Sequence, residues 1–236
     1  MEIKELKGKG KIRVAGTEID VLHNGIDIAF AYPMNGPNTY LDVMSKITNK
    51  NLLRPTTAQM FSLINLSLQN PEEEHCKKIL TILKSNYFWT STENLYTRWG
   101  VFVYDNINGM VKGDKEDLTK RLEAGDESVR FVLYGFKTER QSVLQFIKNP
   151  YIIAQTGKEL MPIVEEVTIK LKRNPHVWTY DWKSGSQKEN IQRYTALSSI
   201  WGDGKFDLNG NFNEDDESGY AIGICNIGEA SCKNKQ

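Results

Sequence analysis

FWTSTENLYTRWGVFVYD, residues 88–105, is the stretch of the chain with the clearest structural signal. Its second half, WGVFVYD, alternates apolar with other residues, and a period of two predicts a strand with one buried face. Bulky aromatic side chains at the start of such a strand usually lie in the core, so we expect Phe88 and Trp89 to be buried. The hydroxyls and the carboxylate of TSTE, residues 90–93, can satisfy nearby backbone groups, which predicts a structural corner.

The next residues, NLYTRW, form a candidate binding face. Asn94, Tyr96 and Arg98 alternate with three other residues and should therefore share one face of the strand. An amide, a phenol and a guanidinium side by side can bind a sugar, a peptide or a carboxylate. We predict that this face binds a ligand, and an ordinary solvated strand edge is the alternative.

The composition limits the classes of function. The 236 residues are 39% hydrophobic and 25% charged, enough for one large domain or two small ones around a core. Thirty basic residues balance thirty acidic ones, so no overall field attracts nucleic acid or an anionic membrane. The N-terminus is charged, and no apolar run reaches the roughly 18 residues that cross a bilayer. We expect a soluble chain without signal peptide or transmembrane segment, cytoplasmic or part of a virion, that binds neither nucleic acid nor membrane.

Three cysteines, Cys76, Cys225 and Cys232, are an odd number and lack the close pairing of a zinc site. Reduced thiols in a reducing compartment are the simpler interpretation. A bridge between Cys225 and Cys232 stays open as the alternative, because separation in sequence does not establish disulfide geometry.

The order of the predicted elements indicates an α+β fold. Residues 11–32 alternate on both sides of Asn24-Gly25, which predicts two antiparallel strands joined by a tight turn. Helical spacing of apolar residues follows at 38–51, 54–70 and 72–86, and strands are predicted at 99–105 and 129–136. Beyond these we predict helices at 139–149 and 157–174, a strand at 175–182, loop mixed with helix at 185–201, a loop at 202–219 and a last strand at 220–225.

Four motifs in this order resemble C-type-lectin-like domains of the Lcl C-terminal type, which are related to fibrobacter paralogous and sulfatase-modifying-factor-like domains. The motifs are LLRPTTAQMFSLI, FWTSTE, WGVFVYD and SVRFV, within residues 20–135. Leu53, Pro55 and Thr56 match the helix start of that family, but Arg54 is inserted among them. The resemblance implies a C-type-lectin-like domain at residues 1–137 and a C-terminal α/β extension at 138–236, with one continuous domain as the open alternative.

The end of the chain also resembles the variable proteins of diversity-generating retroelements, which share the C-type lectin fold. SSIWGDGKFDLNGN, residues 198–211, followed by GYAIGI, residues 219–224, is similar to the glycine-rich ending of those proteins. Under this second alignment the fold closes at Ile224, whereas the first alignment closes it at Val132.

Two further groups of residues in the C-terminal part are candidate sites. The aromatic residues Trp178, Tyr180 and Trp182 alternate and should project from one strand face, either into the core or as a stacking platform for sugars. Oxygen-bearing side chains recur in the predicted loop, as a hard cation such as calcium requires: Asp203, Asp207, Asn209, Asn211 and Asp215. A solvated acidic turn without metal is the alternative, and we predict no other cofactor.

The sequence carries no readable catalytic signature. It lacks a Gly-x-Ser-x-Gly motif and a phosphate-binding loop, and only Cys76 lies in the region that resembles the sulfatase-modifying branch, which uses catalytic cysteines. We therefore expect a non-catalytic ligand-recognition module that binds a carbohydrate or a protein surface. The alternative is a structural or assembly protein of a virus, phage or mobile element that uses the fold as a scaffold, and an oligomer is left open.

Overall fold

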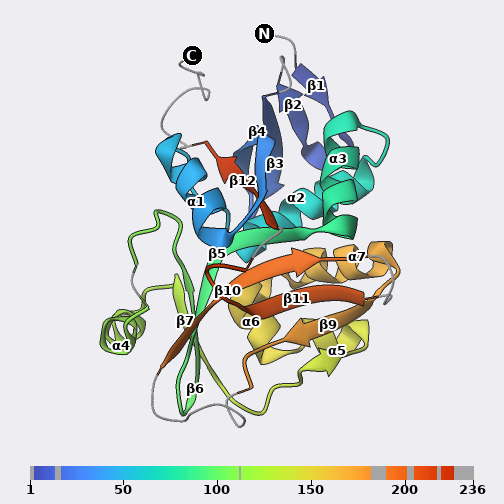
Figure 1. Cartoon of the computed structure of the whole chain (residues 1–236). Coiled ribbons are helices and arrows are strands. Elements are labelled where there is room, and N and C mark those ends of the chain that lie inside the picture. The colour runs from blue at the N-terminus through green and yellow to red at the C-terminus, as the bar shows by residue number, and fades with distance from the viewer. Residues whose placement is uncertain are drawn as a thin grey trace.

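The twelve strands that the structure describes join one mixed sheet. The structure is a computed structural model, and it describes residues 3–13, 17–111, 113–181, 190–200, 205–216 and 219–225. The strands along the main path of the sheet are, in order, β1 (Ile3–Glu5), β2 (Lys11–Arg13), β3 (Glu18–His23), β4 (Ile26–Asn38), β12 (Gly219–Ile224), β5 (Tyr87–Tyr96), β10 (Ile191–Ser198), β11 (Lys205–Phe212), β9 (Asn174–Trp178) and β8 (Glu139–Arg140). From β5 the sheet also branches to β6 (Gly100–Asp105), which pairs with β7 (Val129–Leu133) (Figure 1).

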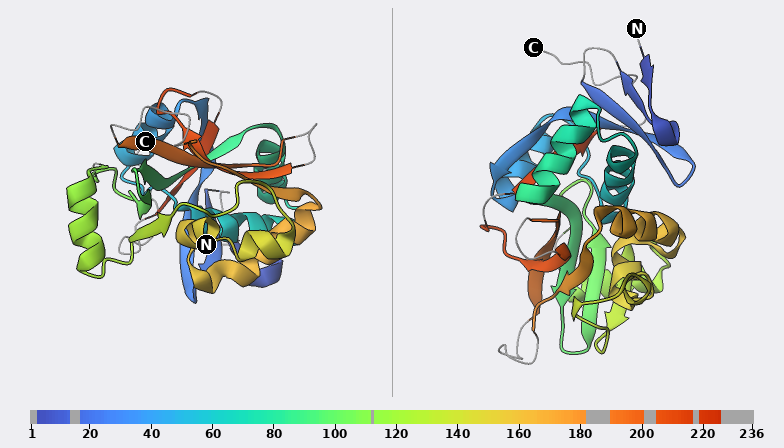
Figure 2. Two further views of the ribbon diagram at one scale, coloured as in Figure 1. Left: turned by 90° about the horizontal axis from the view of Figure 1, so that it is seen from below. Right: turned by 90° about the vertical axis from the view of Figure 1, so that its right-hand side faces the viewer.

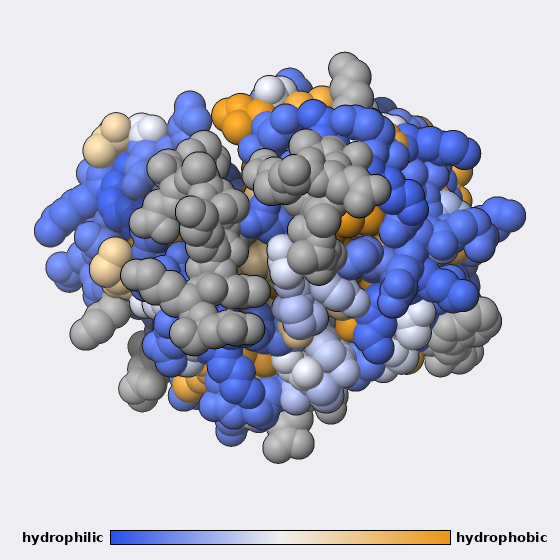
Figure 3. Space-filling model, turned by 90° about the horizontal axis from the view of Figure 1, so that it is seen from above, coloured by the Kyte–Doolittle hydropathy of each residue, from blue (hydrophilic) through white to orange (hydrophobic). Residues whose placement is uncertain are grey.

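The helices cover this sheet in two groups. At one end lie α1 (Tyr40–Asn49), α2 (Thr57–Gln69) and α3 (Glu74–Ser85), and at the other lie α5 (Val143–Ile147), α6 (Pro150–Thr156) and α7 (Met161–Leu171), with short 3-10 turns at Lys7–Lys9 and Lys158–Leu160. The remaining helix, α4 (Lys115–Glu123), stands at the side of the molecule, away from the others (Figures 1 and 2). Most of the described surface seen from above is hydrophilic, with small apolar patches (Figure 3).

Local signals explain the elements of the N-terminal half. Asn24 and Gly25 both have positive φ, the conformation of a tight hairpin turn, and join β3 to β4 in register. Helix α2 begins with a capping box in which the Thr56 side chain accepts from the Gln59 backbone and the Gln59 side chain accepts from Thr56 N–H. The predicted hairpin and the three N-terminal helices are therefore confirmed.

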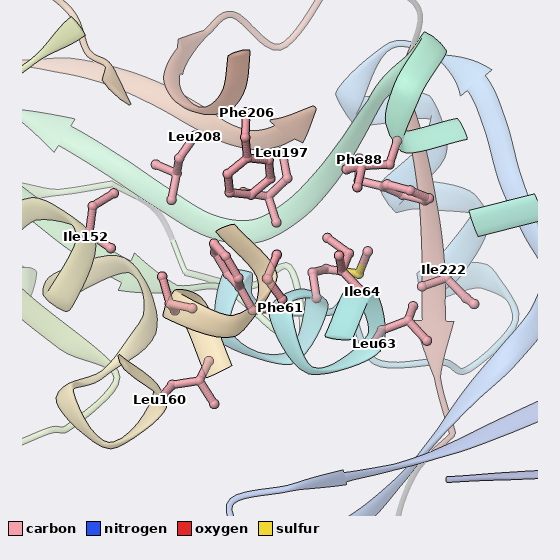
Figure 4. Close-up of a cluster of buried hydrophobic side chains, with 14 of the residues drawn as sticks. Phe61, Leu63, Ile64, Phe88, Ile152, Leu160, Leu197, Phe206, Leu208 and Ile222 are labelled. Atoms are coloured by element: carbon pink, nitrogen blue, oxygen red, sulfur yellow. The ribbon is translucent and has the colours of Figure 1, made fainter. Parts of the chain in front are cut away.

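The main hydrophobic core lies around α2, which packs between α3 and α7. Phe61 of α2 is fully buried and meets Phe206 of β11 edge to face, with ring centroids 5.7 Å apart. In Figure 4, Leu63 and Ile64 of the same helix lie close to Ile222 of β12 and Phe88 of β5, so α2 packs against strands that are far apart in the sequence. Burying this many large side chains is the dominant stabilising contribution to such a fold.

The strand β5 lies in the middle of the sheet, bordered by β12, β10 and β6. Nine of its ten residues are buried, among them Phe88 and Trp89 as predicted. The predicted corner at residues 90–93 is wrong, because these residues continue the strand without interruption. A strand covered on both faces has no solvent side, so its polar residues must all find partners inside the protein.

The strand order interleaves the two predicted parts of the chain. The last described strand, β12, lies between β4 and β5, antiparallel to the first and parallel to the second. The strand β10 pairs with the other side of β5. Residues on both sides of the predicted boundary after residue 137 therefore contribute strands to the same sheet, and the last described strand ends at Ile224.

Two C-terminal segments differ from the prediction. Ile191–Ser198, expected as loop mixed with helix, forms β10, and Lys205–Phe212, expected as loop, forms β11. The strand β10 pairs with β5 and β11, and β11 pairs with β10 and β9, so tertiary pairing overrides their polar composition. Cys76 is a free, buried thiol, as expected, whereas Cys225 forms a disulfide, against the simpler interpretation of reduced thiols. Cys232 lies outside the described residues.

Candidate functional site

The predicted binding face of Asn94, Tyr96 and Arg98 is not a surface. Asn94 and Tyr96 are both fully buried, and only Arg98, beyond the end of β5, is exposed. The prediction is therefore wrong for the first two residues, because β5 has a strand on either side and helices over this face. Arg98 stacks on the exposed ring of Trp99, with its guanidinium carbon 4.4 Å from the ring centroid.

Asn94 instead organises a sealed polar network. Its Oδ1 accepts from the Tyr151 hydroxyl at 2.9 Å and from Gln155 Nε2 at 2.7 Å, and its Nδ2 donates to Thr195 Oγ1 at 2.8 Å. The Tyr96 hydroxyl donates to the Gly210 carbonyl at 2.8 Å. A Cβ on residue 210 would collide with the Tyr151 hydroxyl, so this glycine permits the close approach of β11. The network joins β5, β10, β11 and α6 inside the core.

Glu93 points to the other face of β5 and accepts four hydrogen bonds. Its Oε1 accepts from the Tyr40 hydroxyl and from Asn106 Nδ2, both at 2.9 Å. Its Oε2 accepts from the Tyr104 hydroxyl and from Gln192 Nε2, both at 2.8 Å. A carboxylate has about four lone-pair sites, so these four donors occupy its whole capacity.

Burial and hydrogen bonding act in opposite directions on this carboxyl group. Glu93 is 1% exposed, and burial raises its pKa, while the four donors favour the ionised form and offset part of that shift. Burial and the neighbouring Glu93 carboxylate also raise the pKa of the Tyr40 and Tyr104 hydroxyls. Both phenols therefore stay protonated at neutral pH and act as donors to Glu93.

The Glu93 network forms the floor of a pocket of about 430 Å³, which we call the polar pocket. Strands, loops and helix starts far apart in the sequence contribute its lining: Tyr40, Leu41, Arg54, Glu93, Asn106, Gly109, Val111, Gly113, Asp114, Gln192 and Tyr194. Tyr40 and Tyr194 stack in parallel with ring centroids 3.9 Å apart, which fixes one wall. The pocket thus combines a rigid polar floor with an opening to solvent.

Arg54 lies at the wall of the polar pocket, and only part of its guanidinium group is used in hydrogen bonds to described residues. Its Nε donates to Thr48 Oγ1 at 3.1 Å, and its backbone N–H donates to the Ile107 carbonyl at 3.0 Å. The guanidinium lies against Gly109, where any Cβ would collide with Cζ, Nη1 and Nη2. Among the described residues, no acceptor lies within hydrogen-bond reach of Nη1 or Nη2. Arg54 therefore places a cation at the wall of the pocket.

Apolar side chains border the opening of the polar pocket. Leu41 of α1 lines it and is 47% exposed, and Met110, between the lining residues Gly109 and Val111, is 79% exposed. Exposed large apolar side chains beside convergent polar groups are typical of ligand sites.

The predicted aromatic platform is only partly present in the described residues. Trp178 is 46% exposed and contacts the buried His176 edge to face at 4.7 Å between ring centroids. Tyr180 is half-buried and packs on Tyr96, with ring centroids 5.8 Å apart. Trp182 lies outside the described residues. Trp178 thus remains available at the surface, whereas Tyr180 packs on the core.

The described part of the predicted calcium loop is the strand β11. Same-face residues along a strand are about 7 Å apart, whereas oxygens that share a calcium ion lie within about 5 Å of one another. Asp207 is buried and bonds His176 Nδ1 at 3.0 Å, Asn209 Oδ1 accepts from the Asn211 backbone, and Asp215 is exposed beyond the strand. Asp203 lies outside the described residues, and the described ones contain no cluster of three or more His, Cys, Asp or Glu side chains suited to a metal.

The comparisons with known proteins identify the fold. No protein-family model matches the chain, and no curated protein matches its sequence. A solved structure, from work on the accommodation of massive sequence variation in Nanoarchaeota by the C-type lectin fold, aligns with a TM-score of 0.56 at 13% sequence identity. The alignment covers 82% of this chain and 98% of that chain. The chain therefore has a C-type-lectin-like α+β fold, as predicted, while its assignment to a particular branch of that fold stays a prediction.

The polar pocket was missed because its residues are scattered along the sequence. Tyr40, Glu93, Tyr104 and Gln192 belong to four different elements, and no local pattern links them.

Proposed function

We propose that the protein is a non-catalytic recognition module that binds a carbohydrate in the polar pocket. The observation that carries this proposal is the set of uncommitted polar groups around the opening. Arg54 offers hydrogen-bond donors at Nη1 and Nη2. Gln192 Oε1 and Asp114 Oδ2 offer acceptors that have no partner among the described residues. The Tyr194 hydroxyl can both donate and accept a hydrogen bond.

A mixture of donors and acceptors favours a sugar over a simple anion. Each sugar hydroxyl both donates and accepts, so adjacent hydroxyls match the alternation of Arg54 with Gln192 and Asp114. A purely anionic ligand would meet the carboxylates of Glu93 and Asp114 as well as the Arg54 cation. The apolar side chains of Leu41 and Val111 can cover the C–H face of a sugar ring.

The chemistry of the pocket supports binding without catalysis. None of the described residues that line it is a serine, cysteine, threonine, lysine or histidine, so Glu93 and Asp114 are its carboxylic acid groups and the main candidates for acid–base chemistry. Glu93 is committed to four side-chain donors, so its role is to orient Tyr40 and Gln192 at the pocket floor. The free thiol of Cys76 lies in the core, where burial raises its pKa to about 11 and suppresses the reactive thiolate.

A glycan array followed by calorimetry tests the proposal. We expect at least one glycan to be retained, and Arg54→Gln and Leu41→Arg each to weaken that glycan by about tenfold or more, at unchanged melting temperature. Ile169→Ser, which changes an exposed aliphatic residue on the distant helix α7, is the matched control and should bind normally.

Two results would contradict the proposal. An array without a retained glycan, combined with a discrete oligomer by light scattering, would favour the alternative of a structural or assembly protein. Retention of a glycan that both pocket variants bind as well as the wild type would place the site elsewhere, with Trp178 as the next candidate.

A further inference from the structure

A second hollow, separate from the polar pocket, lies where β7 ends and α5 and α6 begin. Its volume is about 570 Å³, and we call it the apolar groove. Its lining includes apolar and aromatic side chains together with two lysines: Leu133, Tyr134, Phe136, Leu144, Lys137 and Lys148. None of them takes part in the polar pocket, so any role of the groove is independent of the proposed function.

The groove exposes apolar side chains on a fixed frame. Leu133 is 68% exposed and Leu144 is 58% exposed, whereas nine of the described leucines are buried. Phe136 stacks on the buried Tyr151 with ring centroids 5.0 Å apart, and the Tyr134 hydroxyl donates to the Thr97 carbonyl at 2.7 Å. The walls are therefore anchored to the core and are preorganised to receive a partner.

The charge of the groove has one sign. Of the described residues that line it, Lys137 and Lys148 alone are charged. The apolar surface continues toward Trp99, which is 61% exposed and precedes Gly100, the register partner of Leu133. Arg98 stacked over Trp99 adds a third cation at this end. An apolar surface bordered by cations is complementary to an acidic segment with apolar side chains.

The neighbouring strand offers a free edge. Among the described strands, β7 pairs only with β6, so its other edge carries no strand. An extended segment of a partner can add to such an edge through main-chain hydrogen bonds, while its side chains enter adjacent pockets.

We propose that the apolar groove docks an extended acidic segment of a partner protein, with apolar side chains against Leu133 and Leu144 and carboxylates at Lys137 and Lys148. A second copy of this chain is the poorer occupant, because pairing two grooves face to face would bring four lysines together. The partner is thus defined by its chemistry: alternating or clustered carboxylates around one or two bulky apolar residues.

Fluorescence anisotropy with two labelled octapeptides tests the docking site on the full chain. Both carry a central Leu-Phe pair, flanked in one by glutamates and in the other by lysines. We expect the glutamate peptide to bind about tenfold tighter or more at physiological salt. Leu144→Ser should weaken it about fivefold, and Lys137→Glu with Lys148→Glu should reverse the preference between the two peptides.

Two controls keep the interpretation specific. Ile169→Ser, an equally exposed aliphatic change, should leave both affinities unchanged, and so should Arg54→Gln in the polar pocket. All substituted groove residues are exposed, so the variants should fold, which their melting temperatures verify.

Three outcomes would overturn the proposal. The first is equal affinity for the two peptides, and the second is an affinity that neither Leu144→Ser nor the lysine reversal changes. The third is a dimer in sedimentation velocity that Leu144→Ser abolishes, because it would assign the groove to a second copy. Each of these can occur whether or not a glycan binds in the polar pocket.

Discussion

Glu93 and Asn94 are adjacent on β5, and each is a buried polar residue that gathers partners from distant segments, yet their surroundings differ. Asn94 faces α6 and β11 and belongs to a network that the structure closes off from solvent on every side that is described. Glu93 faces α1 and β6 and supports the floor of a pocket that opens to solvent. One face of β5 therefore contributes to a buried hydrogen-bond network that joins elements of the core, and the other face contributes to a candidate binding site.

The difference shows that burial of a polar residue does not by itself indicate a function. Both networks satisfy their members, as a buried polar group requires. On the Glu93 side, by contrast, Gln192 and the neighbouring Tyr194 line an open pocket next to Arg54 and can form further hydrogen bonds there. Substitutions on the two faces of β5 should therefore lower the free energy of unfolding by different amounts.

The largest effect should come from Trp89, which lies on the Glu93 face of β5 but does not line the polar pocket. Trp89 is fully buried, and its Nε1 donates to the Asn38 carbonyl at 3.2 Å. We expect Trp89→Ala to lower the free energy of unfolding by about 3 to 5 kcal/mol, measured by denaturant titration. The exposed Trp178→Ala is the control and should cost less than about 1 kcal/mol. Equal losses for the two would contradict the assignment of Trp89 to the core.

The sealed network should be the next most sensitive. Asn94→Ala leaves Tyr151, Gln155 and Thr195 without their partner in the core, and each unsatisfied buried group costs about 1 to 3 kcal/mol, partly relieved by rearrangement. We expect a loss of about 2 to 4 kcal/mol in chemical denaturation. The exposed Asn213→Ala should have no measurable effect. A loss below about 1 kcal/mol would mean that water reaches this network.

A smaller loss is expected on the open side. Glu93→Gln replaces one acceptor oxygen by an amide that opposes two of the four donors, but pocket water can satisfy part of them, so we expect about 1 to 3 kcal/mol. Tyr104→Phe, which removes a single donor, is the milder comparison. If Glu93→Gln costs more than Asn94→Ala, the proposed contrast between an open and a sealed face is wrong.

The same variant should change the pH dependence in a defined direction. The pKa of Glu93 is raised in the folded state, so this group contributes stability at low pH that is lost as the pH rises through its folded pKa. The difference in unfolding free energy between wild type and Glu93→Gln should therefore increase as the pH is lowered from 8 to 5. A difference that stays constant would show that Glu93 is ionised throughout this range.

The smallest effect should occur at the surface, outside both networks. Asp126 accepts from the Ser128 backbone and hydroxyl and from Arg121 Nε, which lowers its pKa from 3.8 to about 2. Its contribution to stability is present above pH 3.8 and is lost as the pH falls toward 2. Asp126→Asn should flatten the melting-temperature profile between pH 4 and 2, whereas the exposed Asp27→Asn should preserve its slope.

Local patterns predicted much of the fold but little of the site. The hairpin at Asn24-Gly25 and the capped helix α2 follow from residues within a few positions of one another, and the motif order pointed to the C-type-lectin-like fold. The strand β10 was missed because apolar and polar residues do not alternate along it. The strand β11 was missed because its Gly, Asn and Asp residues are typical of a loop, although Phe206 and Leu208 alternate with polar residues. Pairing determines their conformation: β10 pairs with β5, about a hundred residues earlier in the sequence, and β11 pairs with β10 and β9.

The prediction of the binding site was wrong for a related reason. In an isolated sequence, a polar residue in a strand is taken as solvent-facing, and this placed Asn94 and Tyr96 on a surface. Their actual partners, such as Tyr151 and Gly210, become visible only when α6 and β11 are placed against β5. Glu93 was assigned a local role at a corner for the same reason, although its four donors come from residues 40, 104, 106 and 192.

The position of β12 has a consequence for how the protein is made. A ribosome releases β4 and β5 long before residues 219–224, yet these residues occupy the place between the two strands. Until residues 219–224 are synthesised, the nascent chain therefore has an incomplete sheet, in which the edges of β4 and β5 that pair with β12 are unpaired. Premature termination before residue 219 would leave both edges open, so we expect truncated products to be recognised by chaperones and degraded.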